Sequence, residues 1–362
     1  MRALDDEPTD SVVETLGRAR ERLRPAARCS APQVRLWLVA VCTNIGPMAS
    51  ALPDMHSLPA MTLPELRIAD WRPTKDTLHL YAQIVGKMRL ATTPPRNHWW
   101  HAPLYVDVRG LTTGPLRRGD TTFDITLDLV GHELVVRKSG GEGRAFPLVD
   151  GLAVAEFDAR LHGALAELGV DVSIAEQPFG MPVTTPFPED VAHASWDSDA
   201  VERFHRALDW SSSVLEEFSG WFAGKQSPVQ FMWQSFDLSL TRFSGRPSGV
   251  SASDLVSREA YTHEVILFGF WMGDDKTFPD ASFYAFVVPE PKGLREAEIV
   301  AGEWTSIGLT VLPWETVRSA DDPRALLLAF LQSAYETCAG HAGWDVAALE
   351  SAWSPTAGGG QA

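Results

Sequence analysis

Runs of strand-like segments between helices, without strict alternation of strand and helix, restrict the fold of this chain more than any other feature. A helix-like segment at residues 74–85 precedes four strand-like segments between residues 87 and 141, and an amphipathic helix then ends at Gly169. Strands that follow one another without intervening helices pair most readily as antiparallel neighbours, whereas a parallel sheet requires crossovers. The sequence therefore predicts an α+β fold with a largely antiparallel sheet and packed helices.

The same order of elements returns in the second part of the chain. A helix-like segment at residues 201–225 is followed by strand-like segments and by a long apolar helix at residues 322–344. Self-similarity of this kind indicates an internal repeat, so we expect two similar α-β-β-β-β-α halves. Each half carries a Gly-Lys pair closing a helix, then a Trp, then an Arg nine residues later: Gly86, Lys87, Trp100 and Arg109, and Gly224, Lys225, Trp233 and Arg242.

This pattern divides the chain into five parts. They are an N-terminal arm or linker with one short helix (residues 1–62), a first half (63–175), a proline-rich connector (176–200), a second half (201–350) and a disordered tail (351–362).

Composition restricts the partners and the location that we expect. Against 31 Lys+Arg the chain has 47 Asp+Glu, a net charge of −16, which disfavours nucleic acid and anionic membranes as partners. Three cysteines lie far apart without a CxxC pair, as expected in a reducing cytoplasm. The longest apolar run, residues 34–51, is interrupted by Asn44 and Pro47 and is shorter than the ~20 residues of a membrane-spanning helix.

Several long motifs carry a resemblance to a known family. They are QIVGKMRLATTPPRNHWWHAPLYVDVRGLTT, SPVQFMWQSFDLSLTRFSGR, SREAYTHEV with FGFW, and ALLLAFLQSAYE. From about Leu63 to Leu349 the chain resembles a bacterial family catalogued as domain of unknown function 5996. The resemblance implies a coherent domain and no particular activity.

Two segments hold acid–base candidates. In an extended WWHAPLYVDVRG, alternate side chains share a face. The even positions from Trp100 to Val108 would form a core face, and the opposite face would carry a polar row of His101, Tyr105, Asp107 and Arg109. His98 and His101 would then point in opposite directions and could not both bind one metal. An extended REAYTHEV would likewise align Glu259, Tyr261 and His263.

These side chains suit general acid–base catalysis, and we predict His101, Glu259, Tyr261 and His263 as catalytic. Two histidines and one carboxylate could also hold a divalent metal such as iron, zinc or manganese. The residues for that alternative are His98, His101, Glu259 and His263. A third interpretation gives them structural hydrogen bonds between layers.

The ligand-binding candidates are basic and aromatic. If the halves enclose a cleft, Lys87, Arg109, Lys225 and Arg242 would meet there and bind an anionic small molecule, although pairing with nearby carboxylates is the commoner role. Trp99, Trp233 and Trp271 would form aromatic walls, with Tyr105 and Asp237 among the polar contacts. The expected function is a small-molecule enzyme acting on an acidic substrate in an aromatic-lined polar pocket. The alternative is a non-catalytic metabolite-binding or protein-interaction module.

Overall fold

The computed structural model describes residues 62–274 and 278–355. The predicted N-terminal arm therefore lies outside the described residues except for Thr62, and so does the tail beyond residue 355. Residues from Thr62 onward form one compact unit. Within the predicted disordered tail, Ser351 donates its backbone N–H to the Trp221 carbonyl (3.0 Å) and Ser354 is buried, whereas Ala352, Trp353 and Pro355 are exposed. No helix within the described ranges is both long and apolar enough to cross a membrane.

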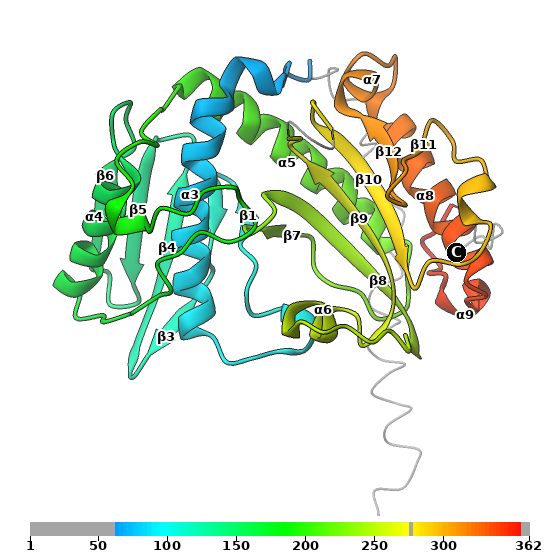
Figure 1. Ribbon diagram of the computed structural model, residues 1–362, viewed down its shortest axis with the longest axis horizontal. Helices are drawn as coiled ribbons and strands as arrows, with labels where there is room; N and C mark the ends of the chain where they lie inside the picture. The colour runs from blue at the N-terminus through cyan, green and yellow to red at the C-terminus, as the bar shows by residue number, and fades with distance from the viewer. Residues whose placement is uncertain (1–61, 275–277, 356–362) are drawn as a thin grey trace, which may run out of the picture. The chain divides into compact units, whose positions relative to one another are not determined.

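Two antiparallel six-stranded sheets form the framework (Figure 1). The first sheet has the order β1-β2-β4-β5-β6, with β3 paired to the beginning of β4. Its strands are β1 (Tyr105–Asp107), β2 (Gly110–Thr112), β3 (Leu116–Arg118), β4 (Thr121–Asp128), β5 (Glu133–Lys138) and β6 (Gly143–Pro147).

The second sheet has the order β11-β12-β10-β9-β8-β7. It meets the first sheet where Leu104 and Phe231 exchange backbone hydrogen bonds of 2.9 and 2.8 Å. Its strands are β7 (Gln230–Met232), β8 (Asp237–Pro247), β9 (His263–Trp271), β10 (Ser282–Val288), β11 (Glu303–Trp304) and β12 (Thr310–Pro313).

Helices cover these sheets and link them. The α-helices are α3 (Ile68–Thr92), α4 (Val154–Glu167), α5 (Ser198–Gly220), α6 (Leu255–Ala260), α7 (Trp314–Arg318), α8 (Pro323–His341) and α9 (Val346–Leu349), and the 3-10 turns are η3 (Asn97–Trp99), η4 (Phe187–Glu189) and η5 (Leu294–Glu296). In Figure 1, α4 lies against the first sheet, whereas α5 and α8 pack on the second. The predicted α+β class with antiparallel sheets is confirmed.

Strand alternation places the core between the second sheet and its two helices. On β8, Leu238 and Leu240 are fully buried, and on β9 the ring of Phe268 packs edge-on against Phe218 of α5 at 5.0 Å. The intervening residues of each strand point to the opposite face. That opposite face, with Asp237 at its start, is free of α5 and α8.

The prediction that Gly86 ends the first helix is wrong, because α3 continues to Thr92. Residues 87–92, predicted as a strand, are therefore helical. A glycine is needed inside this helix because the indole of Trp233 packs directly on it: a Cβ at position 86 would lie 2.5 Å from the Trp233 Nε1. Packing here overrides the low helix propensity of glycine.

Two further predictions are corrected. Residues 99–110 do not form one strand, since η3 and a turn interrupt them, and Val108, expected in the core, is 83% exposed. Residues 170–174, predicted as a strand, have no regular structure. The matched Gly-Lys, Trp and Arg positions also differ in environment: Gly86 lies within α3 whereas Gly224 follows α5, and Arg109 is exposed whereas Arg242 is fully buried.

Candidate functional site

A cavity of 360 Å³ lies on the face of the second sheet opposite α5 and α8. Alternate residues of the strands form its floor, among them Gln230, Asp237 and Ser239. Its walls come from α6 and η3, which pack against each other (Figure 1). Segments far apart in the sequence thus build one concave, aromatic and polar site.

Asp237 is the buried carboxylate of this cavity. Its side chain accepts hydrogen bonds from the hydroxyls of Ser235 and Tyr284, and the residue is only 4% exposed. Burial raises the pKa of Asp237 to about 6, while both hydrogen bonds act to lower it. The group therefore changes charge close to neutral pH.

The Tyr284 hydroxyl reaches Asp237 because Gly269 has no side chain. Gly269 on β9 pairs with Ser239 on one side and Tyr284 on the other, so the tyrosine ring crosses over it towards β8. A Cβ at position 269 would lie 2.5 Å from the Tyr284 Cε1 and Oη atoms. Burial, and then the charge of Asp237, raises the pKa of Tyr284 well above its ordinary value. Tyr284 therefore stays protonated and acts as a hydrogen-bond donor.

The motif NHWWH forms a strained turn that holds α6 in place. His98 and Trp99 have φ angles of 56° and 60°, in the left-handed region that non-glycine residues seldom adopt. The Trp99 indole donates to the Val256 carbonyl at 3.0 Å, and the His98 Nδ1 lies 3.2 Å from the Ala260 carbonyl. Strained residues of this kind tend to occur at functional sites.

The contact of His98 with the Ala260 carbonyl determines the tautomer of the imidazole. Burial is the largest of the effects that lower the pKa of His98, so the imidazole is neutral near pH 7. A carbonyl oxygen can only accept, so Nδ1 carries the proton and Nε2 is left as an acceptor. Nε2 is buried without a hydrogen-bond partner.

Three more residues of the cavity wall have buried polar atoms without partners: the Oε1 atoms of Gln230 and Gln234 and the Oγ of Ser239. Unpaired buried polar atoms are uncommon and destabilising. Four of the fifteen such atoms among the described residues thus belong to residues that line this one cavity.

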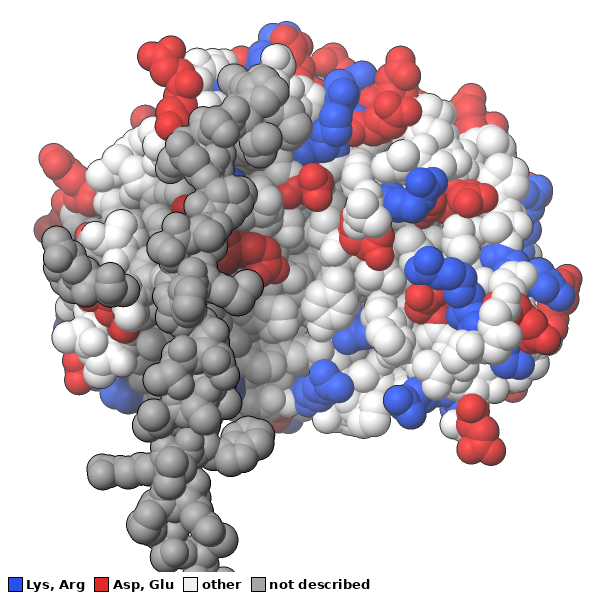
Figure 2. Space-filling model, turned by 180° about the vertical axis from the view of Figure 1, so that it is seen from behind, with Lys and Arg blue, Asp and Glu red and all other residues white. Residues whose placement is uncertain are grey.

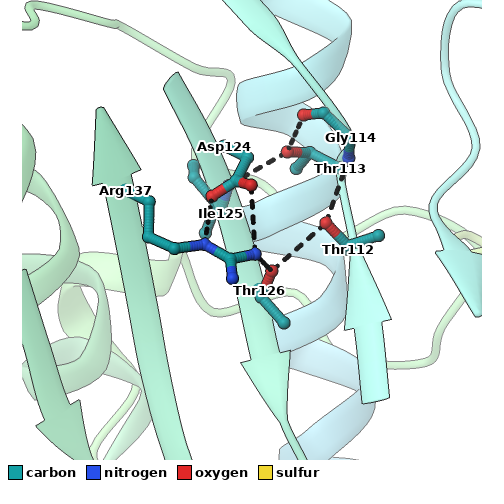
Figure 3. A network of polar contacts seen from close by, with 7 residues as sticks. All are labelled: Thr112, Thr113, Gly114, Asp124, Ile125, Thr126 and Arg137. Carbon is teal, nitrogen blue, oxygen red and sulfur yellow. Dashed lines mark hydrogen bonds and ion pairs between the residues drawn. The ribbon is translucent and has the colours of Figure 1, made fainter. Parts of the chain in front are cut away.

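The first sheet shows how a comparable polar row looks when it is self-sufficient (Figure 3). There Arg137 donates to both oxygens of Asp124 (3.0 and 3.1 Å) and to Thr126, which in turn donates to Thr112 (3.2 Å). Threonine, aspartate and arginine side chains satisfy one another across neighbouring strands. In the polar row of the second sheet, by contrast, polar atoms of Gln230 and Ser239 have no hydrogen-bond partner.

The predicted catalytic row of Glu259, Tyr261 and His263 does not exist. Asp254 caps α6 by accepting from the Ser257 N–H (2.7 Å), so residues 255–260 are helical rather than extended. Glu259 is exposed on this helix, whereas Tyr261 follows it and lines the cavity.

The histidines of the predicted site are also separated. The His98 and His263 rings approach to 5.6 Å, but the His101 ring stacks on Trp99 and its Nδ1 accepts from the Arg96 N–H (3.1 Å). Among the described residues, no group of three or more His, Cys, Asp or Glu is placed to hold a metal ion. The predicted metal set is therefore not assembled.

The four basic residues do not meet in a cleft either. Lys87 donates to the carbonyls of Ala175 (2.9 Å) and Gln177, and Arg109 pairs with Asp128 at the surface. Lys225 lies over the rings of Trp100 (5.2 Å) and Phe243 (4.9 Å), which line the cavity. Arg242 is on the core face of β8, where its guanidinium lies 3.6 Å from the Phe218 ring centroid. Each has its own local role.

Of the other ligand-binding candidates, Trp99, Asp237 and Trp271 line the cavity. Tyr105 instead packs against Arg89, with the guanidinium 5.1 Å from its ring centroid, and the Trp233 indole donates to the Ala102 carbonyl at 2.9 Å. Most residues that line the cavity were not predicted as site residues, among them Gln230, Gln234, Ser235, Ser239 and Tyr284. For Tyr284 a signal exists, since a glycine inside a strand, here Gly269, often marks a close approach by another group.

Charged side chains are mixed on the surface seen in Figure 2, where basic and acidic residues alternate on the described part and the basic ones form no single broad patch. Ion pairs such as Arg246–Glu264 (2.7 Å) and Arg295–Glu290 (2.6 Å) are of this interspersed kind. The absence of a nucleic-acid partner stays a prediction.

No curated protein and no solved structure matches this chain, whereas one family model does. Residues 63–351 match the model of the family of unknown function DUF5996, including both sheets and every residue of the cavity. The chain therefore belongs to the DUF5996 family.

Proposed function

We propose that the chain is an enzyme that binds a small molecule in the cavity of the second sheet and transfers a proton at the Asp237 carboxyl group. The observation that carries the proposal is this carboxyl group, 4% exposed on the cavity wall with its pKa raised to about 6. A general acid or base works best when its pKa lies near the working pH. Burial provides that match here.

The neighbours of Asp237 suit this role. Tyr284 and Ser235 each donate to one carboxylate oxygen, which fixes its orientation and leaves further acceptor capacity on each oxygen. The half-buried Tyr261 also lines the cavity, and burial, followed by the charge of Asp237, raises its pKa. The neutral His98 supplies an acceptor in another part of the cavity, beside Phe243.

The expected acidic substrate is replaced in this proposal by a neutral or cationic one. None of the described residues lining the cavity is Lys or Arg, and its buried charge is the carboxylate of Asp237. An anion would lie near that carboxylate without a fork-shaped donor to receive it. Trp99, Trp271 and Tyr284 present aromatic rings, which attract cations.

A non-catalytic metabolite-binding protein is the second candidate. It is favoured by the hydrogen bonds that Asp237 already accepts, because a carboxylate held in this way can serve to orient a ligand without exchanging protons with it.

The test compares the wild type with Asp237→Asn, using probe amines, amides, lactones and methyl ketones in D₂O. Thermal shift reports binding, and mass spectrometry reports deuterium uptake or bond cleavage. We expect a bound probe to react with a rate that depends on a group of pKa near 6, and Asp237→Asn to react about 10²–10⁴-fold more slowly with the neutral probes, whose binding does not need the carboxylate charge. Asp209→Asn, on the exposed side of α5, is the control. Probes that bind the wild type and return unchanged would establish the binding alternative.

We also propose, as a part of this interpretation, that the two sheets arose by duplication and that the protein works in the cytoplasm. Each sheet is an antiparallel meander flanked by helices, β1-β2-β4-β5-β6 in one and β7-β8-β9-β10-β12 in the other. The reciprocal hydrogen bonds of Leu104 and Phe231 join β7 to the segment that enters β1, so the first strands of the two sheets are neighbours. Of the polar rows described on the two sheets, the one on the second sheet has polar atoms without hydrogen-bond partners.

A further inference from the structure

A second cavity of 370 Å³ adjoins the first. Four residues line both: Trp99, Met232, Gln234 and Val256. The two spaces therefore share a wall made of η3, α6 and the end of β7. A ligand that passes this wall would contact both.

The chemistry of the second cavity is different. Leu90 from α3, Ile174 and Phe179 from the segment after α4, and the ring of Trp233 make it mainly apolar. Its charged residue, Lys87, has its ammonium group directed to the carbonyls of Ala175 and Gln177. This space therefore suits a hydrocarbon group, which gains free energy by leaving water.

The polar side of the shared wall has hydrogen-bond acceptors that lack a donor. Gln230 and Gln234 offer carbonyl oxygens without partners in the cavity that Asp237 also lines, whereas the unpartnered Nε2 of His98 lies further along β8, beside Phe243. These atoms are acceptors. A primary ammonium group carries three N–H donors and a positive charge, so it matches the acceptors, the carboxylate and the aromatic rings together.

We infer that the two cavities together bind one amphipathic amine, with its ammonium group beside Asp237 and its hydrocarbon part in the second cavity, against Leu90, Ile174 and Phe179. The inference rests on the proposed function, because it names the substrate class of the same site. It adds a second binding region and a ligand shape that a single polar cavity would not require.

The test uses the full-length protein and straight-chain primary amines from butylamine to decylamine, titrated calorimetrically. We expect affinity to rise about fourfold per added methylene until the second cavity is full. Alcohols and carboxylates of equal chain length should bind at least tenfold more weakly. Affinity that is independent of chain length, or carboxylates that bind as well as amines, would overturn the inference.

Two variants locate the hydrocarbon part. Ala91→Trp and Ser173→Trp place a large ring at the second cavity, one from α3 and one from the segment after α4, at exposed positions where the fold should tolerate it. Both should abolish the dependence on chain length and leave butylamine binding within about threefold of wild type. Ala325→Trp, at an exposed position of α8, is the matched control. Chain-length dependence unchanged in both variants would show that the hydrocarbon lies elsewhere.

The two proposals fail in different ways. Amines that bind with the expected chain-length dependence but never react would leave this inference standing and remove the enzymatic function. Reaction of a short probe at Asp237, without any effect of chain length, would do the reverse.

Discussion

Replacing Gly269 by alanine should disrupt the site through Tyr284. The new Cβ would lie 2.5 Å from the Tyr284 Cε1 and Oη, whereas nonpolar atoms pack at about 3.5–4.0 Å. The tyrosine ring must therefore move by about 1 Å or more, and β10 holds its backbone in register with β9. The hydroxyl would then leave the Asp237 carboxylate.

Three contributions set the size of the effect on the free energy of unfolding. Overpacking a well-filled site costs about 1–3 kcal/mol. Loss of a hydrogen bond to a charged group costs about 1.5–3 kcal/mol. Against this, alanine restricts the unfolded chain and returns about 0.5–1 kcal/mol. The net expectation for Gly269→Ala is a destabilisation of about 2–5 kcal/mol.

Denaturant unfolding followed by tryptophan fluorescence measures this change. Gly163→Ala in α4 is the matched control, because a Cβ there meets nothing within 4 Å and should stabilise the helix by about 1 kcal/mol. In a Tyr284→Ala background the collision is gone, so Gly269→Ala should cost less than about 1 kcal/mol. If the cost is the same in both backgrounds, Tyr284 is not the cause and the reasoning is wrong.

Two further predictions concern the buried charges. The pKa of Asp237 is raised from 3.8 to about 6, so the folded state holds the extra proton between these values, and stability should fall by about 3 kcal/mol as pH rises through this window. Unfolding titrations at pH 4 to 7 should show this slope in the wild type and its loss in Asp237→Asn; an unchanged slope contradicts the assignment. Burial lowers the pKa of Arg242 to about 9. Arg242→Met removes the charge and keeps the volume, so its free energy of unfolding should stay within about 1 kcal/mol of wild type, whereas Arg242→Ala should lose about 3–5 kcal/mol. Equal losses in the melting curves would show that the charge itself is required.

The alternation of Asp237, Ser239 and Thr241 with Leu238 and Leu240 can be read from the sequence, whereas the neighbours of this strand cannot. The alternation is present in β8, which pairs with β9 from Asp237 to Phe243 and with β7 from Asp237 to Ser239. Tyr284 could not be assigned to the site in the same way. It lies 47 residues from Asp237, and only the pairing register of β9 with β10 brings the two together.

Local signals explain two of the errors. Asp254 lies three residues before Ser257 and caps a helix, a pattern readable in the sequence that argues against an extended REAYT. By contrast, nothing near Gly86 reveals that α3 continues through it. The reason is the ring of Trp233, a contact between distant segments. Tertiary packing of this kind is outside the reach of propensity and periodicity.

The positions of Asp237 and Arg242 explain why the charge in the cavity is negative. The two residues lie on one strand at positions of opposite parity, so alternation alone excludes a common site for them. Within the described residues, no acidic side chain pairs with Arg242 and no basic one pairs with Asp237. Four aromatic rings enclose the Arg242 guanidinium: Phe218, Phe222, Phe268 and Tyr335. Asp237 instead borders a cavity, and the cationic ligand that we propose would supply its positive partner from outside the protein.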